Sequence, residues 1–253
     1  MKDDRKINIK NIFNIRDLGG LKNKDNKIIK DKLIIRSSAL DKLDDEDISA
    51  LKDDYNLKKI IDLRLTDEVE RKKDADIVGV EYLNLSILPK KTPGISRGEK
   101  VDKIPSLKET YKSFVLDKFC EETFSKALNI IINNRNGSIL YHCSAGKDRT
   151  GILTAYILYL LDVDEKIIIQ DYLLSNIHNR TYARKAFFEY LKKTKNLSLA
   201  MNIHKMFVCK KEYINSVLDL IYKDYPSVKE YLFDRLHIDP KEVETFKEYM
   251  LHE

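Results

Sequence analysis

The sequence of 253 residues predicts an α/β fold, with a central, mostly parallel sheet flanked by helices and a helical C-terminal part. Two observations predict it. Strand-like segments alternate with helical ones over about residues 1–163, as in sheets built from parallel strands and crossover helices. Only helical patterns follow over about residues 164–253. We therefore expect a single domain over residues 1–253, made of an α/β core and a helical C-terminal extension.

The apolar pattern gives the elements of the core in chain order. Short apolar or alternating segments predict strands. These are residues 27–30, 33–38, 57–64, 80–86 and 138–143. Acidic first turns and apolar residues at helical spacing predict the helices. These are residues 44–55, 66–73 and 106–133, followed by an apolar helix that begins near Arg149. Residues 87–105 contain three prolines and are expected to form a long loop.

The C-terminal extension repeats the helical spacing in several separate segments. These are residues 164–176, 180–193, 211–225, 227–236 and 240–251. The segment 180–193 combines basic residues with Phe187 and Phe188, so it is either a mobile lid or a helix that packs by its apolar face.

Composition excludes several classes of protein. Hydrophobic residues make up 43% of the chain, which is enough for a core, and the net charge of +5 is lower than nucleic-acid binders usually carry. Three cysteines without CxxC spacing argue against a disulfide framework or a zinc site. The longest apolar run, residues 155–161, is too short to span a bilayer. We expect a cytoplasmic protein without stable membrane insertion or a nucleic-acid partner, unless a secretion leader has been removed.

Residues 142–149, HCSAGKDR, lie between a predicted strand and a predicted helix and are hereafter the cysteine loop. Such a loop directs backbone N–H groups into one concavity, where the helix dipole favours an anion. Gly146 gives the turn its backbone freedom, and the guanidinium of Arg149 matches two phosphate oxygens. Cationic neighbours and a helix N-terminus lower the pKa of a thiol, so Cys143 is expected to attack phosphorus.

The other two cysteines serve as comparisons. Six residues beyond Cys120 stands Lys126, and six beyond Cys209 stands Asn215, whereas Arg149 stands six beyond Cys143. A cysteine followed by arginine at this spacing arises by chance, but the full pattern H-C-x-x-G-K-x-R-T-G between a strand and an apolar helix is far more specific.

The segment HCSAGKDRTG, residues 142–151, resembles the signature loop of cysteine-dependent phosphatases of the protein tyrosine phosphatase superfamily. NIRDLGG (14–20) and IDLRLTDE (61–68) resemble the N-terminal and middle motifs of its bacterial tyrosine/lipid phosphatases. The segment 213–232 resembles the helical tail of that group. The resemblance covers about residues 8–250 and implies a tyrosine-phosphatase-like fold.

By this resemblance, Cys143 is the nucleophile and Arg149 binds phosphate. His142 is expected to help hold the thiolate, and the Thr150 hydroxyl to stabilise it as it leaves. The resemblance assigns the phosphoryl oxygens to the backbone amides from Ser144 to Arg149, which include those of Ala145, Gly146 and Lys147.

A carboxylic acid should protonate the leaving group. Many members of the superfamily carry it on a separate loop, which here would be residues 87–105, with Asp102 as its only aspartate. Related enzymes with a G-x-D-R-T loop resemble this sequence at Asp148, and we expect Asp148 to be the acid.

Asp62 and Asp17 are the alternatives for the acid. Each has an arginine nearby, Arg64 or Arg16, with which it could instead form an ion pair that orients the cysteine loop.

Lys147 stands where phosphoinositide 3-phosphatases with a GK-x-R loop have a lysine, so it could bind a second phosphate or an inositol headgroup. Basic residues of the segment 87–105 could do the same, or touch an anionic membrane. They are Lys90, Lys91, Arg97, Lys100 and Lys103. A loop of mixed charge that is simply solvated is the simpler interpretation.

The expected function is hydrolysis of phosphomonoesters through a cysteinyl-phosphate intermediate, without metal or other cofactor. Phosphotyrosine in proteins is the first expected substrate, with dual or lipid specificity beside it. One alternative is a phosphatase for phosphoinositides or inositol polyphosphates alone. The other is an inactive module that binds phosphorylated ligands.

Overall fold

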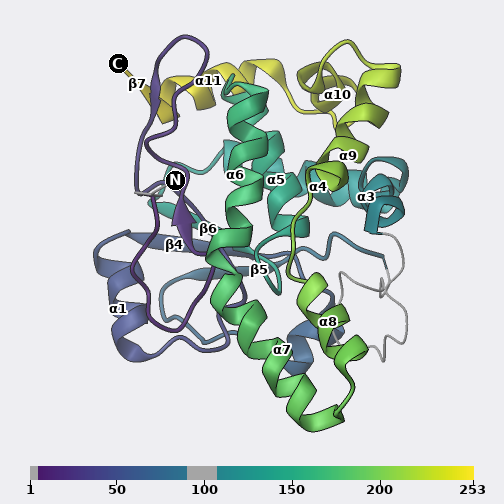
Figure 1. The fold of residues 1–253 in the computed structure, drawn as a ribbon. Helices are drawn as coiled ribbons and strands as arrows, with labels where there is room; N and C mark the ends of the chain where they lie inside the picture. Colours follow the sequence, from purple (N-terminus) through teal and green to yellow (C-terminus); the bar gives the residue numbers. More distant parts are fainter. Residues whose placement is uncertain (1–4, 90–106) are drawn as a thin grey trace.

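The computed structural model describes residues 5–89 and 107–253 and shows a central sheet enclosed by helices (Figure 1). Within these residues a five-stranded sheet has the order β1-β3-β6-β4-β5, and β2 pairs with β7 in a separate ribbon. The strands are β1 (Arg16–Asp17), β2 (Ile28–Ile29), β3 (Ile34–Ser37), β4 (Leu57–Asp62), β5 (Glu81–Asn84), β6 (Ser138–His142) and β7 (Leu251–His252).

Strands β3, β6, β4 and β5 are parallel, and only the edge strand β1 runs antiparallel among the strands described in this sheet. In this register His142, the last residue of β6, lies beside Ser37 of β3 and Asp62 of β4. The carboxyl ends of these three neighbouring strands therefore meet at one edge of the sheet. The prediction of a mostly parallel α/β sheet flanked by helices is confirmed.

Helices surround the sheet and form most of the second half of the chain. In chain order they are α1 (Asp45–Asp53), α2 (Thr66–Arg71), α3 (Leu107–Leu116), α4 (Lys118–Ile132), α5 (Asp148–Leu160), α6 (Glu165–His178), α7 (Arg180–Thr194), α8 (Leu197–Lys205), α9 (Lys211–Asp224), α10 (Val228–Asp234) and α11 (Pro240–Met250).

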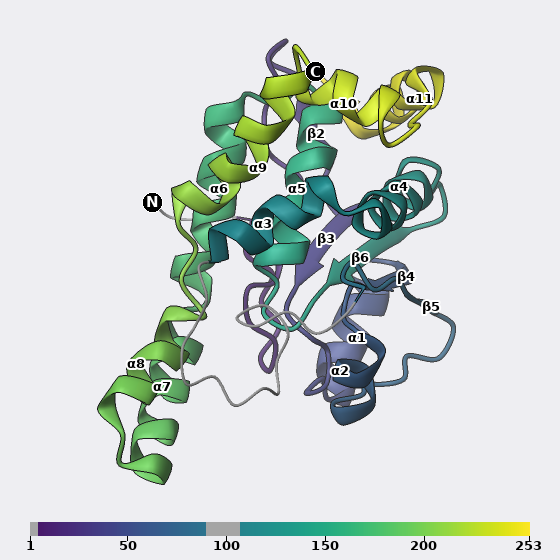
Figure 2. The same cartoon turned by 90° about the vertical axis from the view of Figure 1, so that its right-hand side faces the viewer.

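The two faces of the sheet are covered by different elements (Figure 2). Successive strand residues point to opposite faces, so Ile35, Ile60 and Leu140 pack with Leu51 of α1. Ile61 and Tyr141 lie on the other face, in the main core cluster that also takes in residues of α3 to α6 and α9 to α11. The C-terminal helices and the strands therefore share one core.

Several elements differ from the sequence prediction. The helix expected over residues 106–133 is two helices, because the carboxylate of Asp117 accepts a hydrogen bond from the amide of Phe119 and begins α4 there. The expected strand over residues 27–30 is β2, which pairs with β7 and not with the central sheet. Strands β1 and β7 and helix α8 have no counterpart in the sequence prediction.

No helix of the described residues is long and apolar enough to cross a membrane.

Candidate active site

The cysteine loop connects the central strand to a helix that is buried along its length. All residues of β6 are buried, and so are all residues of α5. Cys143 directly follows β6 and is 2% exposed, while α5 begins at Asp148. The arrangement of strand, loop and helix N-terminus that the sequence predicts is present, and the packing on both sides holds the loop in place.

Gly146 is the residue that permits the turn of this loop. Its φ is +64°, and a Cβ atom at this position would lie 2.4 Å from the carbonyl oxygen of Ser37. A side chain would therefore be strained by its backbone conformation and would collide with β3. The loop can lie this close to the neighbouring strand only with glycine here.

The environment of Cys143 favours its thiolate. Burial raises the pKa of the thiol, but the charge of Arg149 and the hydroxyl and amide of Thr150 lower it further, so that the net pKa is lowered. The Thr150 hydroxyl has no nitrogen or oxygen partner among the described residues. It is therefore available to the sulfur, as the resemblance implies.

Arg149 is held by a residue that the sequence analysis did not identify as functional. Its Nη1 lies 2.6 Å from Oε2 of Glu68, and its Nη2 lies 3.2 Å from Oγ of Ser144. Ser144 in turn donates to Oε1 of Glu68 at 2.6 Å. Burial raises the pKa of Glu68, but Arg149 and Ser144 lower it more, to about 2. Glu68 is therefore ionised and orients the guanidinium.

A second group of side chains holds the carbonyl oxygens of the loop. Asn14 Nδ2 donates to Ala145 O at 3.1 Å and to Gly146 O at 2.7 Å, and Arg36 Nη2 donates to Gly146 O at 2.8 Å. These bonds fix the orientation of the peptide units in the loop. Like Glu68, Asn14 and Arg36 were not singled out from the sequence.

Asp171 of α6 neutralises the two arginines behind the loop. Its carboxylate lies 2.9 Å from Arg36 Nη1 and 3.2 Å from Arg16 Nη2. Burial raises the pKa of Asp171, but Arg16 and Arg36 lower it well below its ordinary value. Arg16 thus contributes to the support of the loop, through Asp171 and through a hydrogen bond to Asn14 Oδ1 at 2.5 Å.

The alternative ion pair between Asp17 and Arg16 is not found among the described residues. The carboxylate of Asp17 accepts hydrogen bonds from the amides of Gly19 at 2.9 Å and Lys32 at 2.5 Å. Adjacent residues of a strand point to opposite faces, so the two side chains separate. Asp17 holds a turn and makes no hydrogen bond to the cysteine loop among the described residues.

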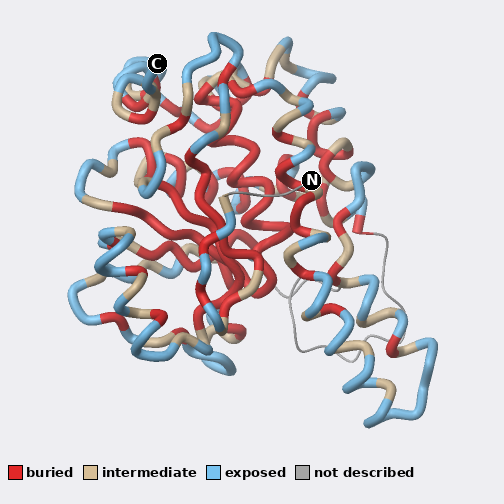
Figure 3. Tube along the Cα trace, turned by 60° about the vertical axis from the view of Figure 1, so that its left-hand side comes forward, coloured by how far each residue is buried: buried red, intermediate tan, exposed pale blue. Residues whose placement is uncertain are grey.

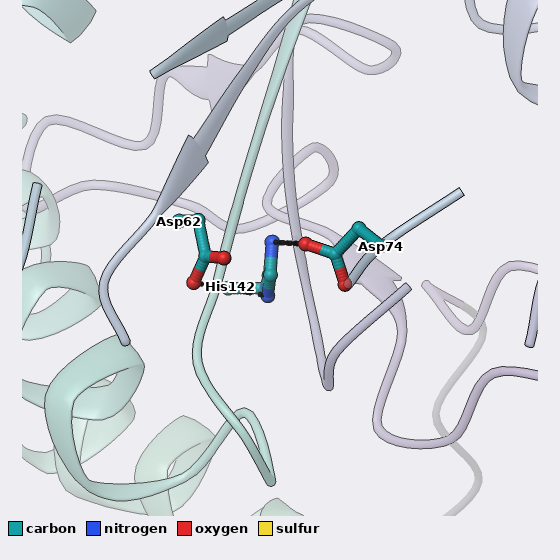
Figure 4. Close-up of side chains that lie close together, drawn as sticks. All are labelled: Asp62, Asp74 and His142. Carbon is teal, nitrogen blue, oxygen red and sulfur yellow. Dashed lines mark ion pairs between the residues drawn. The ribbon is translucent and has the colours of Figure 1, made fainter. Parts of the chain in front are cut away.

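Asp62 forms the ion pair with Arg64 that was the alternative to its role as the acid. Asp62 also lies close to His142 and Asp74 (Figure 4). Arg64 Nη2 lies 2.7 Å from Oδ2 of both Asp62 and Asp74. Tyr82 also donates to Asp62, at 2.7 Å. Because both oxygens of Asp62 are engaged, its carboxylate orients neighbours and is poorly placed to protonate a leaving group.

His142 lies between the two carboxylates. Its Nε2 is 3.1 Å from Asp74 and its Nδ1 is 3.9 Å from Asp62. Burial lowers the pKa of His142, but Asp62 and Asp74 raise it more, and the net pKa is raised. The three side chains are of metal-ligand type and lie within 4.8 Å of one another. Arg64 already supplies the cation for both carboxylates, so we interpret the group as an ion-pair cluster.

Asp148 and Lys147 contact each other at the start of α5. Lys147 Nζ donates to Asp148 Oδ1 at 2.6 Å, and the hydroxyl of Tyr111 donates to the same oxygen. Burial lowers the pKa of Lys147, but Asp148 raises it more. Oδ2 of Asp148 accepts no hydrogen bond from the described residues. Lys147 is 1% exposed, so a second phosphate could reach it only if this pair opened.

The remaining candidates cannot be placed. Asp102 and the five basic residues of the segment 87–105 lie outside the described residues.

Comparison with known proteins decides the family. The family model described as "Tyrosine phosphatase family" matches residues 7–252. The chain belongs to this family. Its cysteine loop therefore lies in a tyrosine phosphatase scaffold, as the signature HCSAGKDRTG implied.

Two curated proteins resemble this family member over part of its length. A tyrosine-protein phosphatase of Nostoc commune is 31% identical over 144 residues, which are 56% of this chain and 47% of that protein. The alignment with the triple specificity protein phosphatase PtpB of Mycobacterium tuberculosis is 170 positions long at 26% identity, and it covers 56% of this chain and 60% of that protein. The match thus spans about half of the length of these relatives.

A solved structure shows a weaker likeness. The core catalytic domain of the PP-IP phosphatase SIW14 of S. cerevisiae, in complex with citrate, overlaps with a TM-score of 0.33 at 21% identity. The overlap covers 76% of this chain and 87% of that one. This score is too low to support an inference about the site.

Proposed function

We propose that the chain hydrolyses phosphomonoesters through a cysteinyl-phosphate intermediate. The observation that carries the proposal is the pairing of Cys143, whose pKa is lowered, with Arg149, whose guanidinium Glu68 holds in place. A thiolate beside a fixed cation is suited to attack a bound phosphate. Membership of the tyrosine phosphatase family supports the same reaction.

In the first step, the Sγ of Cys143 attacks phosphorus and a P–S bond forms as the ester P–O bond breaks. Arg149 and the loop amides bind the non-bridging oxygens, whose charge must be stabilised. Asp148 gives its proton to the leaving oxygen. Oδ2 of Asp148, which accepts no hydrogen bond from the described residues, is the atom suited to carry that proton, because Lys147 and Tyr111 already bond to Oδ1.

In the second step, a water molecule attacks the phosphorus of the cysteinyl phosphate. The Asp148 carboxylate accepts a proton from this water, and the P–S bond breaks to release phosphate. The sulfur leaves as a thiolate, which a hydrogen bond from the Thr150 hydroxyl stabilises. No oxidant or reductant is needed, and the chain returns to its starting state.

Phosphotyrosine in proteins is the proposed substrate class, in agreement with the names of the two curated relatives, a tyrosine-protein phosphatase and a triple specificity protein phosphatase. Dual specificity and phosphoinositide hydrolysis are the second candidate, favoured by Lys147 beside Asp148. Because Lys147 is buried and paired with Asp148, it should bind a second phosphate more weakly than an exposed, unpaired lysine would. The presence of all expected catalytic residue types disfavours an inactive binding module.

One assay separates these possibilities. Phosphate release is measured from a phosphotyrosine peptide and from a series of phosphoinositides, with EDTA present and Cys143→Ser as the control. We expect hydrolysis of the peptide, and a loss of about 10³-fold or more in Cys143→Ser. Turnover of lipid without peptide would favour the second candidate. An absence of activity on both classes would contradict the proposed function, and inhibition by EDTA would contradict the metal-free mechanism.

A further inference from the structure

Helices α7 and α8 pack against each other and extend away from the sheet as a two-helix projection, hereafter the hairpin (Figures 1 and 2). A small core cluster, separate from the main one, lies at its base. The buried members of this cluster are Ala145 of the cysteine loop, Ala183 of α7 and Phe207 just after α8. The outer part of the hairpin does not share in either of the larger core clusters.

Most residues of this outer part are exposed or half-buried (Figure 3), and large apolar side chains are among the exposed ones. Phe188 is 53% exposed, Leu197 is 57% exposed and Met201 is 47% exposed. Together with Phe187 they line a hollow of about 430 Å³ that takes residues from both helices. Isolated exposed apolar residues are common on protein surfaces, but a continuous strip on two adjacent helices indicates an interaction surface.

The hairpin also accounts for the net positive charge of the chain. Residues 180–205 contain seven basic residues and one acidic residue, a net charge of +6, whereas the remaining 39 basic and 40 acidic residues give −1. Among the described residues, Lys185 is the one cation of this segment with an ion-pair partner, Glu189 at 4.0 Å. The guanidinium of Arg184 lies 5.8 Å from the ring of Phe188 and directly borders the apolar strip.

We propose that the hairpin docks on the surface of an anionic lipid bilayer. An amphipathic helix whose apolar strip is bordered by Lys and Arg lies in the interface, with its aromatic residues among the headgroups. The long basic side chains can extend to anionic headgroups while their stems cover apolar surface. A projecting segment can also reach a planar surface without obstruction by the rest of the molecule.

The charge also decides against a second copy of this chain as the occupant, because two surfaces of net +6 would repel each other. An acidic partner helix would match the charge, and the test below includes it. Docking would bring the cysteine loop near the bilayer, because Ala145 belongs to the cluster at the base of the hairpin. The proposal does not depend on the proposed hydrolysis.

The test is co-sedimentation of the full chain with phosphatidylcholine vesicles, with and without phosphatidylserine. We expect binding only when phosphatidylserine is present, and weaker binding at higher salt. Phe188→Asp, Leu197→Asp and Arg184→Glu should each lower the affinity about tenfold. Leu116→Asp and Lys118→Glu are the matched controls, because these side chains are 66% and 83% exposed outside the hairpin. They should bind as the unmodified chain does.

Far-ultraviolet circular dichroism and thermal unfolding show whether each variant is folded, and neither should differ from that of the unmodified chain. Equal binding by the hairpin variants and the controls would overturn the proposal. So would the absence of binding to anionic vesicles at low salt. Capture of an acidic amphipathic peptide by a chain that does not bind vesicles would overturn it in favour of a protein partner.

Discussion

Glu68 of α2 holds Arg149 at the start of α5, with Oε2 of the carboxylate 2.6 Å from Nη1 of the guanidinium. Both side chains are buried, and Ser144 Oγ bonds to the other carboxylate oxygen. The cation proposed to bind phosphate is therefore positioned before substrate arrives. Such preorganisation is a main source of electrostatic stabilisation in active sites.

Glu68→Gln should lower kcat/KM for an aryl phosphate about tenfold to a hundredfold, because a neutral amide orients the guanidinium less firmly. Steady-state kinetics measure this, and Glu70→Gln, an exposed position on the same helix, is the control. Unchanged kinetics in Glu68→Gln would show that Arg149 keeps its position without the ion pair.

Glu68 should also give the protein a pH-dependent stability. Its pKa is lowered from 4.5 to about 2, so the stabilisation is fully present above pH 4.5 and is lost as the pH falls towards 2. The difference corresponds to about 3 kcal/mol in the free energy of unfolding. Urea unfolding measured from neutral pH to pH 2 should show that the free energy of unfolding falls more steeply in the unmodified chain than in Glu68→Gln. Parallel curves would contradict this.

Thr150→Val should raise the pKa of Cys143, because it removes the hydroxyl that donates to the thiolate. A charged hydrogen bond of this kind corresponds to about one pKa unit, so alkylation by iodoacetamide below that pKa should slow about tenfold. Burial raises the pKa of Cys120 to about 12 and that of Cys209 to about 11, so neither should contribute. Thr154→Val, one turn further along α5, should leave the alkylation rate unchanged.

Asp148→Asn should slow hydrolysis of esters with poor leaving groups by about 10² to 10⁴-fold. The effect should be much smaller for an activated aryl phosphate, whose leaving group needs no proton. The pH–rate profile should also lose the limb that reports the acid. Asp17→Asn is the control, because Asp17 bonds to Gly19 and Lys32. Turnover of a poor leaving group at the rate of the unmodified chain would exclude Asp148 as the acid.

Gly146→Ala should abolish activity and destabilise the fold, because the new Cβ would lie 2.4 Å from the Ser37 carbonyl oxygen. Gly20→Ala is the matched control. Gly20 also has a positive φ, of +81°, but no atom lies within 4 Å of the position of its Cβ. Its substitution should cost about 1 kcal/mol from backbone strain alone. Thermal unfolding and kinetics distinguish the two, and equal effects would show that the contact with β3 is unimportant.

Much of the fold and the centre of the site could be predicted, because both are encoded locally. Strand β6 is a short, mostly apolar segment, and β4 has Ile60 and Ile61 in its buried half. The proposed nucleophile and its arginine lie within seven consecutive residues. Strands β1 and β7 have two residues each, which is too short for a periodic pattern. The break between α3 and α4 depends on the single cap at Asp117.

The residues that support the loop could not be predicted, because sequence spacing carries no information about their contacts. Glu68 lies 81 positions from Arg149, and Arg36 lies 110 positions from Gly146. Arg16 lies 155 positions from Asp171. One signal was available for Glu68, since it lies in the first turn of a helix that follows the strand beside β6. Arginine within the apolar strand β3 was a similar signal for Arg36.

The position of Asp171 has a consequence for how the chain is made. The loop carbonyls depend on Arg36, and Arg36 and Arg16 depend on a carboxylate that the ribosome adds 28 residues after Cys143 and 22 residues after Arg149. Before α6 is synthesised, the nascent chain already contains the whole signature motif. Its Arg16 and Arg36, which are buried in the folded protein, then still lack the carboxylate of Asp171. The newly made protein should therefore gain activity only with α6, and a fragment ending near residue 163 should stay inactive.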